Sequence, residues 1–586
     1  MKRIPPPGES STKAASLWPL LIAAVTFAVF LPSLRNGFVN WDDTLNLVGN
    51  YQYRGLGCAQ LKWMFTTCYT GPYQPLSWAT LGLDYLLWGM DPFGYHLTNV
   101  LLHCFNAFLF CLLCAKLFAL AARPSGPEGS TAVNISAGFA ALVFAVHPLR
   151  VESVAWVTER RDVLCGLFYL LTLLCYIAAR SGSGQKAPAW RRHALPAAAF
   201  FLALLSKGMA VSLPLVLVIL DIYPLRRLPA DPRQWFSREN RELWYEKIPY
   251  FALAAIFGAI GYACQDQTGA VASYQAFGFD RRAAQVFFAL FFYVRKTFIP
   301  LELSPLYKLP EDSGLLYFPV MLAAAAAVII TALAIALRRR WPAGLAAWLC
   351  YLAIIFPVAG AVKLGVQAAA DRYTYLACLG FAALAGAGLR AGLQAADTRL
   401  RKGCVLLACL VIAGLAALTW RQQGVWRNSE TLWRQALAVD PDIDLARNNL
   451  GEALAAQGRI DEAIIHYRNA VSLSPAYAIA HYNLANALVP KALLDEAVSH
   501  YRAALKNNPD FPQAHYNLAA VLAAQGKTGE AVEHYRETLR LGPDADANYK
   551  LGLLLSAQGR TEAAAAHFRE AARLNPSLRA PAPGRK

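Results

Sequence analysis

Two adjacent carboxylates, Asp42 and Asp43, lie just after the first long apolar run, in the stretch FVNWDDTLN. Acidic residues are common in surface loops, and the neighbouring Trp41 is typical of the membrane–water interface. A carboxylate held near a reacting hydroxyl group can also act as a general base. We predict that this pair is catalytic, with Asp42 as the base and Asp43 orienting the site or binding sugar or a metal ion.

Further charged side chains lie next to other apolar segments, in the stretches HPLRVESVAWVTERRD, SKGMAV and DRYTYLA. Arg binds phosphate oxygens through its planar fork, whereas Lys acts as a point charge. These residues therefore predict a site for a lipid phosphate and its sugar. The alternative is that the cations pair with Glu152, Glu159, Asp162 and Asp371 or contact ordinary phospholipid. The predicted binding residues are Arg150, Glu152, Arg160, Arg161, Lys207, Arg372 and His96.

A polar stripe runs along the second apolar segment. His96, Asn99, His103 and Asn106 follow one another at intervals of three and four residues, which places them on one helix face. In lipid such a face must turn inward. We expect Asn99 and Asn106 to hydrogen-bond to other helices, and His96, nearest the outer surface, to line the site. The spacing provides no third ligand, so we predict no metal centre here.

The composition is that of a membrane protein. Of 586 residues, 56% are hydrophobic and 16% charged, and the mean hydropathy is +0.32. The net charge of +17 could suggest a nucleic-acid partner. No zinc-finger spacing or basic helix supports one, and much of the excess lies in loops between apolar runs.

Eleven apolar segments are candidates for membrane spans. They are residues 16–34, 96–120, 134–148, 162–180, 194–206, 208–223, 248–264, 315–337, 342–361, 373–391 and 402–420. The apolar run 283–294 is too short to cross a bilayer and is bracketed by Arg and Lys, so we predict a helix at the interface.

Lys and Arg predict the orientation of these spans. With eleven spans and a cytoplasmic N-terminus, the basic loops near residues 191, 226–247, 338–340 and 399–402 all fall inside. Residues 35–95, 149–161, 265–314 and everything after 420 then lie outside. The first span has no clear cleavage site after it, so we expect it to be retained.

Two cysteines, Cys58 and Cys68, lie in the long first outer loop. They either pair in an oxidising compartment or remain free, and the sequence favours neither. The other ten lie in or beside apolar runs, where a thiol acts as a small hydrophobe.

The last 160 residues repeat with a period of 34. Asn449-Leu450-Gly451 returns as Asn483-Leu484-Ala485 and Asn517-Leu518-Ala519. Small residues let paired helices approach each other, an aromatic residue fills the gap, and a proline stops each second helix. The pattern predicts about four tetratricopeptide (TPR) repeats in an α-solenoid.

The stretches FVNWDDTLN, YHLTNVLLHCFNAFLF, HPLRVESVAWVTERRDVL, SKGMAV and DRYTYLA, followed by TPR repeats, resemble the transmembrane TPR-containing O-mannosyltransferases and their bacterial relatives. That family belongs to the GT-C class, which uses polyprenyl-phosphate-linked sugars. The resemblance implies an acidic catalytic motif at Asp42 and Asp43. It also implies binding roles for Arg160 and Arg161 in the second outer loop and for Arg372 at the start of a late span.

These observations together predict an all-α, GT-C-like domain over residues 1–420 and an extracytoplasmic TPR domain over residues 421–586 of an inner-membrane protein. We expect an inverting transfer of a sugar, mannose in the resembling family, from a polyprenyl phosphate to a Ser or Thr hydroxyl of an envelope protein presented by the repeats. The alternatives are a glycan or lipid acceptor on the same fold, or a non-enzymatic membrane-anchored scaffold. The sequence identifies no certain cofactor, and assistance by a divalent cation stays open.

Overall fold

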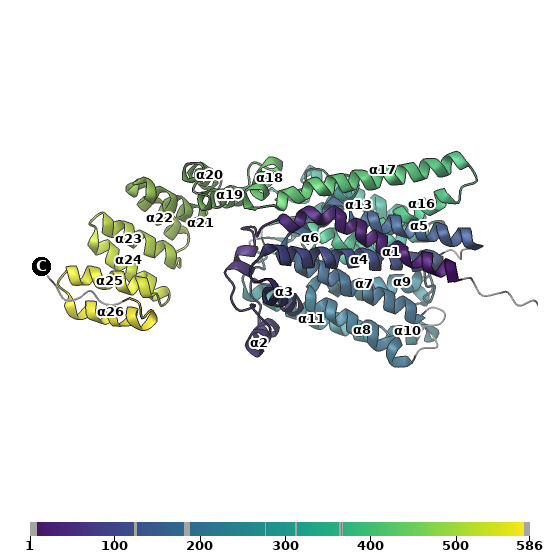
Figure 1. The fold of residues 1–586 in the computed structure, drawn as a ribbon, viewed down its shortest axis with the longest axis horizontal. Helices are drawn as coiled ribbons and strands as arrows, with labels where there is room; N and C mark the ends of the chain where they lie inside the picture. The colour runs from purple at the N-terminus through teal and green to yellow at the C-terminus, as the bar shows by residue number, and fades with distance from the viewer. Residues whose placement is uncertain are drawn as a thin grey trace, which may run out of the picture. The chain divides into compact units, whose positions relative to one another are not determined.

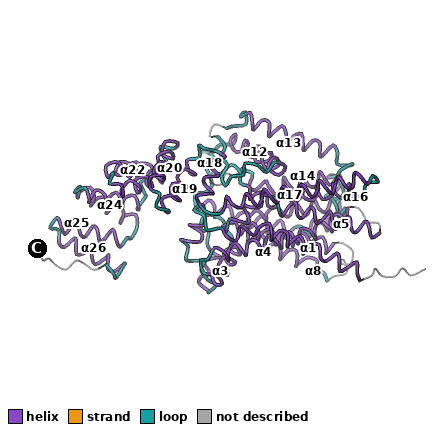
Figure 2. The backbone as a smooth tube through the Cα atoms, turned by 45° about the horizontal axis from the view of Figure 1, so that its top comes forward, coloured by secondary structure: helices purple, strands orange, loops and turns teal. Residues whose placement is uncertain are grey.

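The computed structural model describes residues 9–121, 126–180, 188–275, 277–310, 313–362, 365 and 367–578. This part of the chain is helical and contains no β-strand (Figure 2). One isolated bridge joins Tyr307 to Ala369. The predicted all-α class is confirmed.

The chain divides into two compact units, residues 1–435 and 436–586. The division predicted after residue 420 falls near the end of helix α17 (Thr398–Gln423), and α18 (Ser429–Val439) carries the chain across the observed boundary.

In the described part of the first unit, six helical segments are long and apolar enough to cross a membrane: Leu17–Arg35, Pro92–Ala121, Val157–Arg180, Ile248–Gln267, Phe318–Ala336 and Thr398–Trp426. Two bent pairs raise the number to as many as eight, Gly129–Ala145 with Pro148–Ala155 and Asp371–Ala377 with Leu379–Leu393. Shorter apolar helices cover Arg192–Ser206, Gly208–Ile222 and Pro342–Val358. Every segment predicted from the sequence corresponds to one of these, and the chain is a membrane protein.

The helices of this unit are joined by short helical turns. The apolar helices are α1 (Glu9–Phe30), α4 (Pro92–Ala121), α5 (Gly126–Ala145), α7 (Arg160–Arg180), α8 (Ala189–Ser206), α9 (Leu213–Ile222), α11 (Ile248–Gln267), α13 (Phe318–Ala336), α14 (Pro342–Ile355), α16 (Leu379–Leu393) and α17. Between them lie α2 (Cys58–Thr66), α3 (Pro75–Trp88), α6 (Val151–Ala155), α10 (Arg241–Tyr245), α12 (Phe279–Phe298) and α15 (Thr374–Ala377), and the turns η1 (Leu31–Arg35), η2 (Thr44–Val48), η3 (Pro148–Arg150), η4 (Val157–Glu159), η6 (Gly208–Ser212), η7 (Pro232–Gln234), η8 (Arg238–Asn240), η9 (Phe356–Val358) and η10 (Asp371–Tyr373).

Prolines mark several helix starts. Pro75, Pro214, Pro249, Pro319 and Pro342 each lie at the first or second position of a helix. Proline suits these positions because its fixed φ is already helical and the N–H that it lacks would have had no partner inside the helix. The sequence therefore sets where these helices begin.

Helix α4 packs against α1, α5 and α7 (Figure 1). Its polar stripe is fully buried, as predicted. The Asn99 amide donates to the carbonyl oxygens of Val154 and Trp156, over 3.2 and 3.3 Å, and Asn106 donates to the Val163 carbonyl over 2.8 Å. These bonds tie α4 to the chain around the second loop, so the expected interhelical role of both asparagines is confirmed.

Helix α12 contains the run 283–294 that was predicted to lie at the interface. It is not among the helices apolar enough to span a membrane, because Arg281, Arg282, Arg295 and Lys296 lie within it. Lys296 donates to the carbonyl oxygens of Leu301 and Glu302 over 2.5 and 2.9 Å, which fixes the turn that follows the helix. Its position at an interface stays a prediction.

A disulfide joins Cys68 to Cys264, across 196 residues. Cys58 is free and exposed. Pairing of Cys58 with Cys68, one of the two alternatives left by the sequence, is therefore wrong. The bond attaches the first long loop to the end of α11.

Up to residue 578, the last that the structure describes, the second unit contains four packed helix pairs: α19 (Asp444–Ala456) with α20 (Ile460–Leu473), α21 (Ala478–Leu488) with α22 (Leu494–Asn507), α23 (Pro512–Ala524) with α24 (Thr528–Leu541), and α25 (Ala545–Ala557) with α26 (Thr561–Leu574). A Cβ atom on Gly451 would lie 2.6 Å from the Tyr467 ring, and one on Gly552 would lie 2.8 Å from the Phe568 ring. The small and aromatic positions therefore pack together as the 34-residue period predicts.

Candidate active site

The loop that follows the first apolar helix is held in place by Asp43. This carboxylate is buried and accepts three hydrogen bonds, from the Val39 amide over 3.1 Å and from the Thr158 amide and hydroxyl over 3.1 and 2.6 Å. Burial raises the pKa of Asp43 to about 7, although these hydrogen bonds oppose the shift. Asp43 thus joins the first loop to the turn η4 of the second loop.

The neighbouring carboxylate of Asp42 is only partly buried. Among the described residues, none makes a hydrogen bond or ion pair with it. Burial raises the pKa of Asp42, and the charges of Arg161 and Arg372 lower it in part. The two carboxylates therefore differ: the hydrogen-bonding capacity of Asp43 is used inside the protein, and that of Asp42 is available to a ligand.

Glu159 is the centre of the charged cluster beside Asp42. It is fully buried and accepts both Nε and Nη2 of Arg161, over 3.0 and 2.5 Å. It also accepts Nζ of Lys207 over 3.0 Å and contacts Nε of Arg372 at 3.2 Å. One carboxylate therefore gathers three cations that come from α7, from the turn between α8 and η6, and from η10.

A second carboxylate, Glu152, fixes Arg372. It accepts Nη1 of Arg372 over 2.5 Å and the Arg372 backbone amide over 2.8 Å. The guanidinium lies over the rings of Trp156 and Tyr373, at 5.4 and 5.1 Å from their centroids. Arg372 is thereby held rigidly in the cluster.

A third acid, Asp162, orients Lys207. It accepts Nζ of Lys207 over 2.7 Å through one oxygen and the Ser153 hydroxyl over 3.2 Å through the other. The three acids and three cations therefore form one network at this end of the bundle. The pairing of the cations with Glu152, Glu159 and Asp162, which the sequence left as an alternative, is what the structure contains.

The pairing uses only part of the donors of these cations. Arg161 donates through Nε and Nη2, and Lys207 donates through two of its three protons. Arg372 donates through Nη1 and lies within ion-pair distance of Glu159 through Nε. The side chains of Arg161 and Lys207 are each 13% exposed. One guanidinium amino group on each arginine and one Lys207 proton therefore remain for a ligand.

Arg160 points away from this network, although it adjoins Arg161. It is fully buried, forms a 2.6 Å ion pair with Asp84 and donates to the Tyr95 carbonyl and the Asn99 side chain. Because α7 begins at Arg160, successive side chains there leave the helix in different directions. The structure does not bring Arg160 together with the other predicted binding residues.

His96 and Arg150 also lie apart from the network. His96 is fully buried against the backbone of Asn36 and Gly37, and neither ring nitrogen makes a hydrogen bond of acceptable geometry. Arg150 donates to the Thr374 hydroxyl over 2.9 Å and lines a separate apolar cavity. Of the predicted site residues, the network contains Glu152, Arg161, Lys207 and Arg372. Asp42 lies beside the network, and Asp43 holds the loop that carries Asp42.

Tryptophans surround the Asp42 loop. Trp41 lies 6.3 Å from Trp156 and 5.1 Å from Trp433, measured between ring centroids, and Trp156 stacks on Trp426 at 5.4 Å. The indole N–H of Trp433 donates to the Asn40 side-chain oxygen over 2.7 Å. The start of α18 therefore packs directly on the loop that carries Asp42, a relationship for which the sequence contains no local signal.

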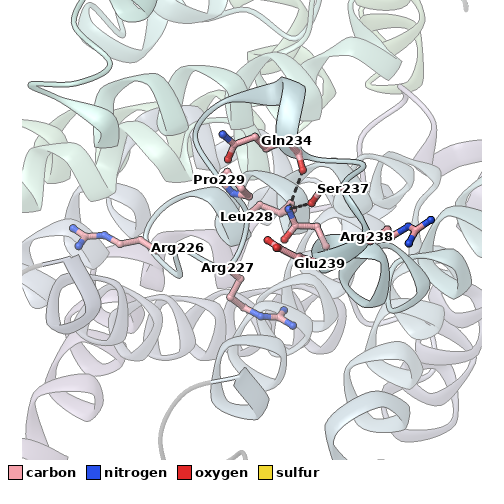
Figure 3. A pocket seen from close by; sticks show the side chains of 9 residues that line it. Arg226, Arg227, Leu228, Pro229, Gln234, Ser237, Arg238 and Glu239 are labelled. Atoms are coloured by element: carbon pink, nitrogen blue, oxygen red, sulfur yellow. Dashed lines mark hydrogen bonds between the residues drawn. The ribbon is translucent and has the colours of Figure 1, made fainter.

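Among the described residues, no group of three or more His, Cys, Asp or Glu side chains is placed to hold a metal ion. A basic pocket of about 410 Å³ lies elsewhere, in the loop after α9 (Figure 3). Arg226, Arg227 and Arg238 line it, and the Asn240 amide donates to the Gln234 carbonyl and the Ser237 hydroxyl. None of the predicted site residues lines this pocket.

Family models of the tetratricopeptide repeat match residues 451–489, 482–546 and 521–579. The TPR prediction is confirmed. The match to the solved structure titled "Crystal structure of MamA" covers 25% of this chain and 87% of that one, at 23% identity and a TM-score of 0.24.

Curated relatives are protein O-mannosyl-transferases. TMTC1 from Homo sapiens is 26% identical over 76% of this chain and 54% of its own length, and TMTC4 from Mus musculus is 28% identical over 68% and 57%. Tmtc2 from Xenopus laevis is 37% identical over 27% of this chain and 17% of its own length. The chain therefore spans between 17% and 57% of these three relatives. The resemblance to TPR-containing O-mannosyltransferases is confirmed.

Proposed function

We propose that this chain, whose curated relatives are protein O-mannosyl-transferases, transfers mannose from a polyprenyl-phosphate donor to a Ser or Thr hydroxyl of an envelope protein. The observation that carries the proposal is the contrast between the two adjacent acids. Asp43 is fixed by three hydrogen bonds, whereas the Asp42 carboxylate is free beside cations that retain unused donors. A base next to a phosphate-binding group is what this transfer requires.

Asp42 is the general base in this mechanism. The acceptor hydroxyl oxygen attacks the anomeric carbon while its proton passes to the Asp42 carboxylate. The raised pKa of Asp42 makes its carboxylate a stronger base once it is ionised, which supports this role. Asp43 holds the loop and does not take the proton, because its oxygens already accept three hydrogen bonds.

Arg161, Arg372 and Lys207 stabilise the leaving group. As the new bond forms, the bond between the anomeric carbon and the phosphate oxygen breaks, and its electron pair leaves on the polyprenyl phosphate. The remaining donors of these cations can meet the growing negative charge. Their pairing with Glu152, Glu159 and Asp162 holds them in place before the donor arrives, so little reorganisation is needed. A single displacement of this kind inverts the anomeric centre.

The TPR repeats supply the acceptor. Repeats of this type bind proteins through extended surfaces, and the family-model matches cover residues 451–579 with their overlaps. We assign the repeats to the outer side of the inner membrane, together with the Asp42 loop. The Cys68–Cys264 disulfide supports this side, because disulfides persist in oxidising compartments.

Glycoproteomic comparison tests the proposal. Envelope proteins from cells with and without this chain are digested, and peptides carrying a hexose on Ser or Thr are quantified by mass spectrometry. We expect a defined set of hexosylated peptides to disappear without the chain and to return with the wild-type protein but not with Asp42→Asn. An unchanged set of hexosylated peptides would contradict protein O-mannosylation.

A further inference from the structure

A second cavity lies in the membrane-spanning part of the first unit, away from Asp42. Its volume is about 510 Å³, and its wall is formed by α5, α16 and α17 with the end of α12. The lining is almost wholly apolar and includes Phe139, Phe144, Phe381, Ala385, Leu407 and Val411. Such a cavity favours a hydrocarbon occupant.

Arg150 supplies the polar end of this cavity. It is 2% exposed, and one amino group donates to the Thr374 hydroxyl. Its Nε and Nη1 atoms are buried without a hydrogen-bond partner. His147 and Cys378 also line the cavity near Arg150, and neither is a strong hydrogen-bond acceptor for it. Both ring nitrogens of His147 are already bonded, to the Thr297 carbonyl and the Leu149 amide, and the Cys378 thiol is a poor acceptor.

No carboxylate among the described residues forms an ion pair with Arg150 within 4.0 Å. A buried guanidinium without a counter-ion is costly, because both its charge and its unpaired N–H groups are removed from water. The cations of the Glu159 network are each paired with acids, so Arg150 differs from them. The two acids that act on Arg150 electrostatically, Asp162 and Asp371, accept hydrogen bonds from Lys207 and Tyr307 instead. The structure therefore contains, at the end of an apolar cavity, a buried cation with no directly paired carboxylate.

We propose that this cavity binds an anionic membrane phospholipid, with one acyl chain along α16 and α17 and its phosphate on Arg150. The phosphate would accept a hydrogen bond from one of the two unpaired atoms, Nε or Nη1, which lie on opposite edges of the guanidinium. The part of α17 that lines the cavity runs from Cys404 to Leu415, a length of about 16 Å at the rise of an α-helix. That is roughly half of the ~30 Å hydrocarbon core and matches the depth of one leaflet.

The site is separate from that proposed for the sugar donor. None of Asp42, Arg161, Lys207 and Arg372 lines the cavity. Arg150 and Arg372 are nevertheless connected, because Arg150 bonds Thr374 and Arg372 bonds Glu152, two residues from Arg150. A lipid phosphate on Arg150 would therefore support the segments that carry the network.

Two substitutions and a matched control test the site. Arg150→Gln removes the charge, and Gly388→Leu fills the cavity, where a Cβ atom on Gly388 meets no atom within 4 Å. Gly414→Leu is the control: its Cβ atom is equally unhindered, but Gly414 does not line the cavity. Phosphatidylglycerol is titrated into the detergent-purified full-length chain, and lipid-bound protein is quantified by native mass spectrometry. Diacylglycerol, which lacks the phosphate, and a polyprenyl phosphate are the comparison ligands.

We expect the affinity for phosphatidylglycerol to fall at least about tenfold in Arg150→Gln, as for loss of a charged hydrogen bond, and in Gly388→Leu. Gly414→Leu should bind like the wild type, and diacylglycerol should bind more weakly than phosphatidylglycerol. Wild-type affinity in folded Gly388→Leu protein would overturn the proposal. Displacement of phosphatidylglycerol by polyprenyl phosphate would also overturn it, because the cavity would then belong to the donor site.

Discussion

The indole N–H of Trp433 donates to the side-chain oxygen of Asn40 over 2.7 Å, although 393 residues separate them. The Asn40 backbone amide donates in turn to the Ser429 hydroxyl over 2.9 Å. Asn40 is two residues before Asp42, so the start of α18 holds both the backbone and a side chain of the loop that carries the proposed base. Positioning of Asp42 therefore depends on a segment near the end of the first unit.

Trp433→Phe should lower the rate of sugar transfer without weakening donor binding. The ring can still pack against Trp41, but the hydrogen bond to Asn40 is lost, so the Asp42 loop becomes less well positioned. The loss of one such bond corresponds to about a two- to tenfold fall in kcat. Steady-state kinetics with the purified full-length chain would measure it. Trp420→Phe, at an exposed position on α17, is the control and should leave kcat unchanged.

Asp43→Asn should change how protein stability depends on pH. The pKa of Asp43 is raised to about 7, so between about pH 4 and pH 7 the folded state binds more protons at this site than the unfolded state. Wild-type stability should therefore fall as the pH rises across this window. The amide does not titrate, so the variant should lack this component.

Thermal unfolding in detergent at several pH values would show the effect. Asp43→Asn should be destabilised by about 1–3 kcal/mol near pH 5, from losing one hydrogen-bond acceptor in a buried site, and the difference should shrink toward pH 7. If the stabilities of the wild type and of Asp43→Asn changed with pH in the same way, the raised pKa of Asp43 would be contradicted.

The pH profile of transfer should report the ionisation of Asp42. A general base must be deprotonated, so kcat/KM should fall as the pH drops through its pKa, which burial raises above the usual value of about 3.9. Arg161→Gln removes a charge that lowers this pKa and should move the acidic limb to higher pH. Arg161→Lys keeps the charge and should leave the limb in place. If the acidic limb of kcat/KM lay at the same pH in Arg161→Gln and Arg161→Lys, the charge of Arg161 would not influence the pKa of Asp42.

Repeats and helices could be predicted because their signals are local. The 34-residue period and the apolar runs each lie within one stretch of sequence, and helix formation follows them. The partners of the site residues could not be predicted, since Glu152 and Arg372 meet across 220 residues. Arg160 and Arg161 look equivalent in sequence, yet the start of α7 sends one to Asp84 and the other to Glu159. Similarly, nothing near Cys68 indicates that Cys264 is its partner.

The disulfide provides a test of which side of the membrane the Asp42 loop occupies. Cys68 and Cys264 should resist alkylation until a reductant is added, whereas the free and exposed Cys58 should react at once. Intact cells treated with a membrane-impermeant maleimide should label Cys58 from outside. Labelling of Cys58 only after the membrane is broken would place this loop in the cytoplasm and reverse the predicted orientation.

Transfer by Asp42→Asn tests the central claim most directly. The purified full-length chain is given a polyprenyl-phosphate-linked mannose and an acceptor peptide with Ser and Thr, and the glycosylated peptide is quantified over time. Asn is similar in size to Asp but cannot take the hydroxyl proton, so turnover should fall by about two to four orders of magnitude while donor binding is retained. Asp43→Asn should lose less. Near-normal turnover in folded Asp42→Asn protein would contradict the assignment of Asp42 as the catalytic base.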